Sequence, residues 1–231
     1  MSREPYNAAA VSEVSGNDST PDQTVPLFGM TIVGEGARVN RKYRMAGPTI
    51  VRAVMSRIER GGLRPGERIM PQQLAQRLGT SSTPVREALC QLVGRDILIE
   101  RHREGFYVAS ITSTTLRALY AAHGRVVATM LHRWHAGARL AESASNRWRL
   151  FSAIAAGVDD DALAGMERYL AGRLAVARKH EATHVVQDTV ARDLIPALRA
   201  GDATTALEIS RDFHQDCEIA ASQIWQSMVE R

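Results

Sequence analysis

The chain has 231 residues, of which 45% are hydrophobic, and a formal net charge of +4 at pH 7, which is enough apolar material for one full core and a smaller second one. Its two cysteines, Cys90 and Cys217, lie far apart inside apolar helical patterns, which excludes a disulfide-framed secreted fold. No apolar run approaches the length of a membrane span, and the N-terminus lacks the apolar core of a secretory signal. We therefore expect a cytoplasmic protein whose two thiols are reduced and buried.

The positive charge is concentrated in one segment. Residues 1–40 hold 2 basic and 5 acidic side chains, residues 41–110 hold 13 and 6, and residues 111–231 hold 14 of each, so the net charges are −3, +7 and zero. A basic domain joined to a neutral one is typical of a DNA-binding protein with a separate sensing domain. An ordinary solvated basic surface is the alternative interpretation.

The first 40 residues are rich in Ser, Asn, Asp, Gly, Pro and Thr and show no sustained period, which predicts a flexible tail. A first helix is predicted from about residue 48 to residue 61. Its inward face is formed by Ile50, Val54, Met55 and Ile58.

Two short helices with a tight turn follow. Pro71 suits the first turn of a helix, and Leu74, Ala75 and Leu78 share one face of it. Gly79 ends this helix, because glycine enters the left-handed conformation without strain.

Ser81 is predicted to cap the next helix, with Pro84 in the first turn. Its inward stripe is Val85, Ala88, Leu89 and Leu92. A strand that starts with residues 97–99, a basic tip at 101–105 and a returning strand at 106–108 complete the pattern. This order predicts a winged helix-turn-helix, which places one helix in the major groove of DNA.

Residues 46–110 resemble the DNA-binding domain of the GntR family of bacterial transcription regulators. The matching pieces are GGLRPGERI, LAQRLGTSSTPVREAL and GFYV. The family has a base-reading arginine where this chain has Ser82, and its second arginine is matched by Arg86. The wing residue is matched by His102, and some members also contact DNA from the position of Gln72. The predicted DNA contacts are Gln72, Ser81, Ser82, Thr83, Arg86, His102 and Arg103.

After residue 110 the pattern is helical throughout. Thr112 or Ser113 can cap a long helix, a second helix is predicted at about 140–156, and the acidic run 159–161 suits the start of a third. A further helix leads to Leu198, and the turn at 199–202 precedes the last helix. The fold class is therefore mostly α. It combines an N-terminal winged helix-turn-helix (41–110) with a C-terminal all-α helical bundle (111–231) for effector binding and dimerisation.

The second half resembles the all-α effector domain of the FadR-type branch, through TTLRALYAAHGRVV and LIPALRAGDATTALEISRDFH. The resemblance places a pocket-facing arginine at Arg125, which could hold a carboxylate through two parallel hydrogen bonds. Many members of that branch bind a divalent metal through one Asp and three His. His180, His184 and His214 are the candidates here, but the family's other ligands have no convincing match. A small organic effector is favoured over a metal.

The sequence thus predicts a homodimeric, DNA-binding transcription regulator, a repressor that a small-molecule effector releases from its double-stranded operator. Two alternatives are a small helical metal-dependent enzyme and a winged helix used only for protein interaction. The sequence contains no nucleophile motif, phosphate loop or HExxH pattern that would support the enzyme.

Overall fold

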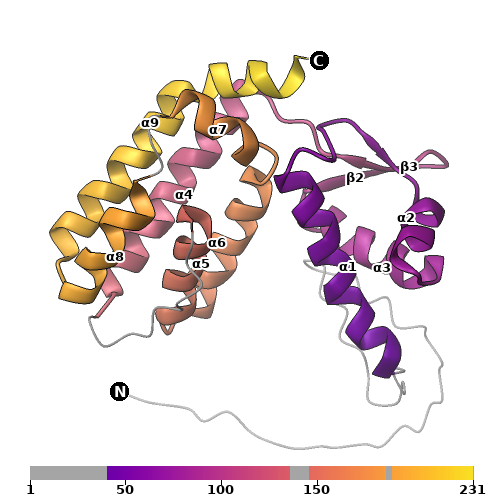
Figure 1. Cartoon of the computed structure of the whole chain (residues 1–231), viewed down its shortest axis with the longest axis horizontal. Helices are drawn as coiled ribbons and strands as arrows, with labels where there is room; N and C mark the ends of the chain where they lie inside the picture. The colour runs from indigo at the N-terminus through magenta and orange to yellow at the C-terminus, as the bar shows by residue number, and fades with distance from the viewer. Residues whose placement is uncertain (1–40, 136–145, 186–188, 231) are drawn as a thin grey trace, which may run out of the picture. The chain divides into compact units, whose positions relative to one another are not determined.

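The computed structural model describes residues 41–135, 146–185 and 189–230, with no side chains described for residues 41–46. These ranges contain a winged helix-turn-helix followed by helices only (Figure 1), which confirms the predicted fold class. The tail predicted at residues 1–40 lies outside them, as does most of the link between the first two helices of the C-terminal half. No helix in the described ranges is both long enough and apolar enough to cross a membrane.

The first helix of the winged-helix domain is α1 (Arg41–Glu59), and it buries Ile50, Val54 and Ile58 as the apolar spacing predicts. The predicted start at residue 48 was wrong, because Pro48 lies inside the helix rather than in its first turn. A proline removes one backbone hydrogen bond, which a long helix packed on a core can tolerate.

The helix-turn-helix consists of α2 (Pro71–Leu78) and α3 (Ser82–Val93). Gly79 ends α2 in the left-handed conformation with φ 62°, as predicted. Ser81 is the residue before α3, but its side chain makes no capping hydrogen bond, so that detail of the prediction was wrong. The predicted inward stripe of α3 is confirmed, since Val85, Ala88, Leu89 and Leu92 are all fully buried.

The wing is an antiparallel sheet of β1 (Arg68–Ile69), β2 (Leu98–Arg101) and β3 (Gly105–Val108), in the order β1-β3-β2. The sequence predicted the last two strands but missed β1, because two residues are too few to show an alternating pattern. Ile69 of β1 pairs with Phe106 of β3, and both side chains are buried.

The helical domain (residues 111–231) contains α4 (Ser113–Arg133), α5 (Arg147–Gly157), α6 (Asp161–Leu174), α7 (Arg178–His184), α8 (Val190–Ala200) and α9 (Ala203–Val229). Helices α4 and α9 run side by side (Figure 1), and α6 and α8 pack against them.

Four of these helices begin at a side chain that accepts a hydrogen bond from the first turn, and for α5 that side chain is Asn146, which accepts from the backbone N–H of residue 149. Thr112 accepts from the backbone N–H of residue 115, Asp160 from that of residue 163, and Asp202 from that of residue 205. The backbone N–H of Leu163 holds the pKa of Asp160 below its ordinary value. The acidic run therefore starts α6, as predicted, by capping it.

Other sequence predictions in this domain were wrong in detail. The second helix begins at Arg147 after its cap Asn146, and the predicted residues 140–145 lie outside the described ranges. Three apolar residues of α6 and α9, Met166, Tyr169 and Ile219, are 55%, 38% and 71% exposed. Apolar side chains are common on protein surfaces, so periodicity alone does not place each of them.

The two cysteines are both free, but they differ in their surroundings. Cys217 is fully buried in α9, and burial raises the pKa of its thiol above the ordinary range. Cys90 is exposed on α3, so the prediction of two buried thiols was wrong for this one. The inward stripe of α3 runs along the opposite side of the helix, through Leu89 and Leu92.

A carboxylate with no exposed surface lies at the centre of the helical domain. Glu181 of α7 accepts hydrogen bonds from the Tyr120 hydroxyl at 2.8 Å, the Arg147 guanidinium at 2.8 Å and the Trp148 indole at 2.9 Å. A buried carboxylate is tolerated only when it is paired and hydrogen-bonded. These contacts join α4, α5 and α7 around one charge.

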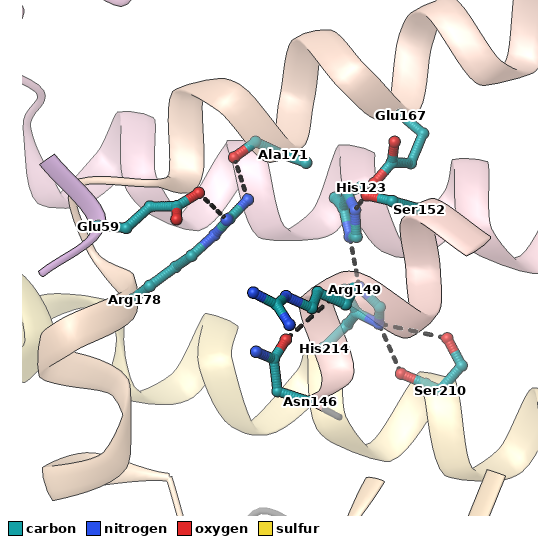
Figure 2. Close-up of polar contacts among 10 residues, drawn as sticks. All are labelled: Glu59, His123, Asn146, Arg149, Ser152, Glu167, Ala171, Arg178, Ser210 and His214. Carbon is teal, nitrogen blue, oxygen red and sulfur yellow. Dashed lines mark hydrogen bonds and ion pairs between the residues drawn. The ribbon is translucent and has the colours of Figure 1, made fainter. Parts of the chain in front are cut away.

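A second buried polar chain crosses from α9 to α4 (Figure 2). His214 Nδ1 donates to the backbone oxygen of Ser210 at 2.6 Å, and its Nε2 lies 2.8 Å from Nδ1 of His123. His123 Nε2 faces Glu167, with 4.0 Å between the two side chains. Burial, and then the neighbouring His123, lower the pKa of His214 to about 3, so His214 is neutral in the folded chain.

This burial predicts a pH-dependent stability. The pKa of His214 is 6.5 when unperturbed and about 3 in the folded chain. Between pH 6.5 and pH 3 this imidazole therefore takes up a proton only when the chain is unfolded. The free energy of unfolding should therefore fall as the pH is lowered from 6.5 toward 3, by up to about 1.4 kcal/mol per pH unit from this group. Urea unfolding of the wild type and His214→Gln across this range would measure the difference in slope.

A suitable control is His102→Gln, which removes a histidine that is exposed in the folded chain. It should leave the pH slope of the wild type unchanged. Equal slopes in the wild type and His214→Gln would show that His214 is not held neutral by the fold.

Candidate nucleic-acid interface

The exposed end of α3 carries the residues that the sequence predicted to face DNA. Ser81, Ser82, Thr83 and Arg86 are all exposed, while Pro84 between them packs inward. Gln72 is exposed in the first turn of α2. The structure therefore leaves this set free for contact with a groove, although contact with DNA stays a prediction.

The wing ends in a short turn that presents basic side chains. Arg101 pairs with Gly105 across the sheet, which leaves His102, Arg103 and Glu104 as the tip. Arg103 has a φ of 62°, in the left-handed region that tight turns often require of one residue. His102 and Arg103 are both exposed, as predicted.

Arg86 connects the recognition helix to the wing. Its guanidinium lies 3.7 Å from the Glu100 carboxylate on β2 and 5.7 Å from the centre of the Phe106 ring on β3. Both partners of this ion pair are largely exposed, at 59% and 43%, so the pair contributes little to stability and can be exchanged for a contact with DNA.

Glu100 was not among the residues predicted from the sequence. The predicted strand started at residues 97–99 and the predicted tip began at residue 101, and no role was assigned to Glu100 between them. An acidic side chain 3.7 Å from an exposed arginine orients the arginine, and it would repel a phosphate that came close.

The winged-helix domain and the helical domain belong to one compact unit, Arg38–Arg231. Arg178 of α7 donates to Glu59 at the end of α1 at 2.5 Å and to the backbone oxygen of Ala171 at 2.6 Å (Figure 2). Its guanidinium also lies over the Trp148 ring, 4.4 Å from the ring centre. Arg178 thus joins the last turn of α1 to the interior of the helical domain.

The residues predicted to bind an effector or a metal lie on three helices, with Arg125 on α4, His180 and His184 one turn apart on α7, and His214 on α9. Arg125 is exposed on α4, whereas His123 beside it is buried, so an effector role for Arg125 stays a prediction that requires a surface site. His214 is engaged by His123 and by the Ser210 backbone, and His184 bonds the Ser227 hydroxyl at 2.7 Å. Among the described residues, no group of three or more His, Cys, Asp or Glu side chains is arranged to hold a metal ion.

Comparison with known proteins finds matches to the winged-helix segment of the chain. Residues 48–108 match the bacterial regulatory proteins of the gntR family. A stretch of 60 residues is 38% identical to an uncharacterized HTH-type transcriptional regulator, YdhC, from Bacillus subtilis (strain 168). That match covers 26% of this chain and spans only 27% of the relative's length.

Two solved structures share the fold over most of the chain. A putative GntR transcriptional regulator from Rhodococcus sp. RHA1 aligns with a TM-score of 0.63 at 18% identity, covering 81% of this chain and all of the other. The E. coli protein McbR/YncC aligns with a TM-score of 0.58 at 19% identity, covering 77% and 97%. The family match is confined to the winged-helix segment, residues 48–108, and the likeness to the two solved structures shows that the chain shares their fold.

Proposed function

We propose that this chain is a cytoplasmic, sequence-specific DNA-binding transcription regulator, a repressor that acts as a homodimer and is released by a small-molecule effector. The observation that carries the proposal is the exposed N-terminal end of α3, where Arg86 lies against the wing, on the segment that holds the whole positive excess of the chain. A recognition helix and a basic wing on one surface match the groove and the adjacent backbone of a duplex.

This chain has Ser82 where the gntR family has its first base-reading arginine, which limits the base contacts that α3 can make. A serine at residue 82 has no long donor to reach a guanine edge, so base reading from α3 depends on Arg86 and on the short side chains before it. We infer that the operator differs from those of family members that carry the arginine.

The first test separates base reading from phosphate binding. Arg86→Ala should weaken operator binding by about 1–3 kcal/mol and leave nonspecific binding nearly unchanged, because a base contact is lost. Arg103→Ala should weaken binding to all sequences and flatten the salt dependence, because a phosphate contact is lost. Fluorescence anisotropy at several salt concentrations would measure both effects. Unchanged operator affinity in a folded Arg86→Ala protein would refute the assignment.

A second prediction concerns the ion pair of Arg86. Glu100→Gln should raise affinity for nonspecific DNA by up to about fivefold, because it removes a negative charge beside the phosphates and frees the guanidinium. Discrimination between operator and nonspecific DNA should fall. Glu208→Gln, which removes an exposed charge from α9, is the matched control and should change neither quantity. Tighter operator binding with undiminished discrimination would argue against this role of Glu100.

The dimer is proposed because one recognition helix makes too few contacts to select an operator. The tryptophans offer little apolar surface for a dimer contact, since Trp148 is buried and the part-buried Trp134 and Trp225 each donate to a backbone oxygen. In the described part of the chain, Ile219 on α9 is the most exposed of the large hydrophobic residues, at 71%, and we propose that the face around it forms the dimer contact.

Light scattering at micromolar concentration should return twice the chain mass of 25.3 kDa. Ile219→Asp should shift the protein toward a monomer, because a charge would be buried at the contact. Met166→Asp, which changes an exposed apolar residue on α6, is the control. A wild-type mass near 25.3 kDa would refute the dimer.

Two other functions stay as alternatives: a small helical metal-dependent enzyme and a winged helix used only for protein interaction. Gel retardation on the DNA upstream of the chain's own gene, with excess competitor DNA present, distinguishes them from the proposed regulator. The regulator gives a shifted band that resists competitor, whereas an enzyme or an interaction module gives none.

A further inference from the structure

The junction between the winged-helix domain and the helical domain contains a cavity of about 210 Å³. One wall is the loop after α1, with Arg64, and another is α7, with Lys179 and His180. The end of α9 closes it through Ser227 and Glu230. A larger cavity of about 630 Å³ lies beside it and shares Arg64 and Glu230 with it.

Positive charge outweighs negative charge around the smaller cavity. Within the described part of the chain, neither the Arg64 guanidinium nor the Lys179 ammonium has an ion pair, and Glu230 is the one acidic residue in the lining. The pKa of His180 is lowered first by burial and then by the charges of Lys179, His184 and Arg64, which agrees with the positive charge of the lining. Cations that outnumber carboxylates on a concave surface attract an anion.

The backbone supports the placement of Lys179. Gly61 has a φ of 68°, and a Cβ there would lie 2.5 Å from Cδ of Lys179. Glycine suits residue 61 for two reasons. It adopts the left-handed conformation without strain, and it leaves room for the aliphatic part of the Lys179 side chain to pass. The ammonium is in this way brought from α7 to the loop that carries Arg64.

We propose that this cavity binds a small polyanionic metabolite, a di- or tricarboxylate or a phosphate monoester, through Arg64, Lys179 and His180. A guanidinium, an ammonium and an imidazole suit the oxygens of either anion. The size of the cavity limits the ligand to a small molecule.

A ligand in this cavity would contact both domains. Lys179 follows Arg178, which donates to Glu59, and the loop with Arg64 leads into β1 of the wing. Binding would therefore favour one arrangement of the recognition surface over others. This regulatory consequence rests on the proposed function, whereas binding of the anion does not.

Isothermal calorimetry on the full chain at low ionic strength tests the site, with succinate, citrate and inorganic phosphate as probes. At least one probe should bind with a Kd of about 1 mM or tighter, because three donors converge on it. Lys179→Met and Arg64→Gln should each weaken that binding by about tenfold or more. Arg199→Gln removes an exposed charge in the last turn of α8 and should leave binding within about twofold of the wild type.

The probes distinguish the two ligand classes, since a carboxylate site prefers succinate or citrate and a phosphate site prefers phosphate. Circular dichroism melting shows that each variant is folded. The proposal is overturned if no probe binds the wild type at about 10 mM, or if folded Lys179→Met and Arg64→Gln bind as the wild type does. If the anion binds as expected but leaves operator affinity unchanged, the site stands and its regulatory role fails.

Discussion

Glu181 has no exposed surface, and its charge is tolerated only because a tyrosine, an arginine and a tryptophan from two other helices donate to it. Removing any donor would leave a buried carboxylate short of partners, which costs far more than an exposed ion pair gains. The carboxylate therefore determines how α4, α5 and α7 pack. Trp148, which donates to it, also lies against Arg178, so the same packing sets the position of the arginine that reaches α1.

The centre of the helical domain is occupied by its own side chains. His123, Trp148, Phe151, Phe213 and His214 form a continuous aromatic cluster with ring centres 5.0–6.2 Å apart. Close packing of this kind transmits displacements between helices rather than absorbing them. Because side chains fill the centre of the helical domain, we expect a ligand to influence DNA binding more directly from the cavity at the junction of the two domains.

The surface formed by α3 and the wing carries opposite charges close together, on Arg86 and Glu100. Arg86 is held by Glu100 in the free chain, and the pair is exposed enough that a guanine edge or a phosphate can replace the carboxylate. An arginine with an internal partner gains less from nonspecific DNA than a free one, because it must give up that partner. Under the proposed function, Glu100 would therefore contribute to selectivity without contacting a base.

Much of the winged helix could be predicted from the sequence, because its signals are local. Gly79 must take the left-handed conformation, Pro71 suits a first turn, and the stripe through Leu89 repeats at helical spacing. The helical domain was less predictable. Glu181, Arg147 and Tyr120 meet across 34 to 61 residues of sequence, and no local pattern signals that contact. The Arg86–Glu100 pair and the cavity at Lys179 were missed for the same reason.

The central claim is that α3 and the wing read a particular DNA sequence. Selection of random-sequence duplexes by the purified full chain, followed by sequencing of the bound fraction, tests it most directly. The account predicts an enriched inverted repeat whose half-sites are centred about one helical turn apart, as a pair of recognition helices requires. Retention of DNA without any enriched sequence would contradict it.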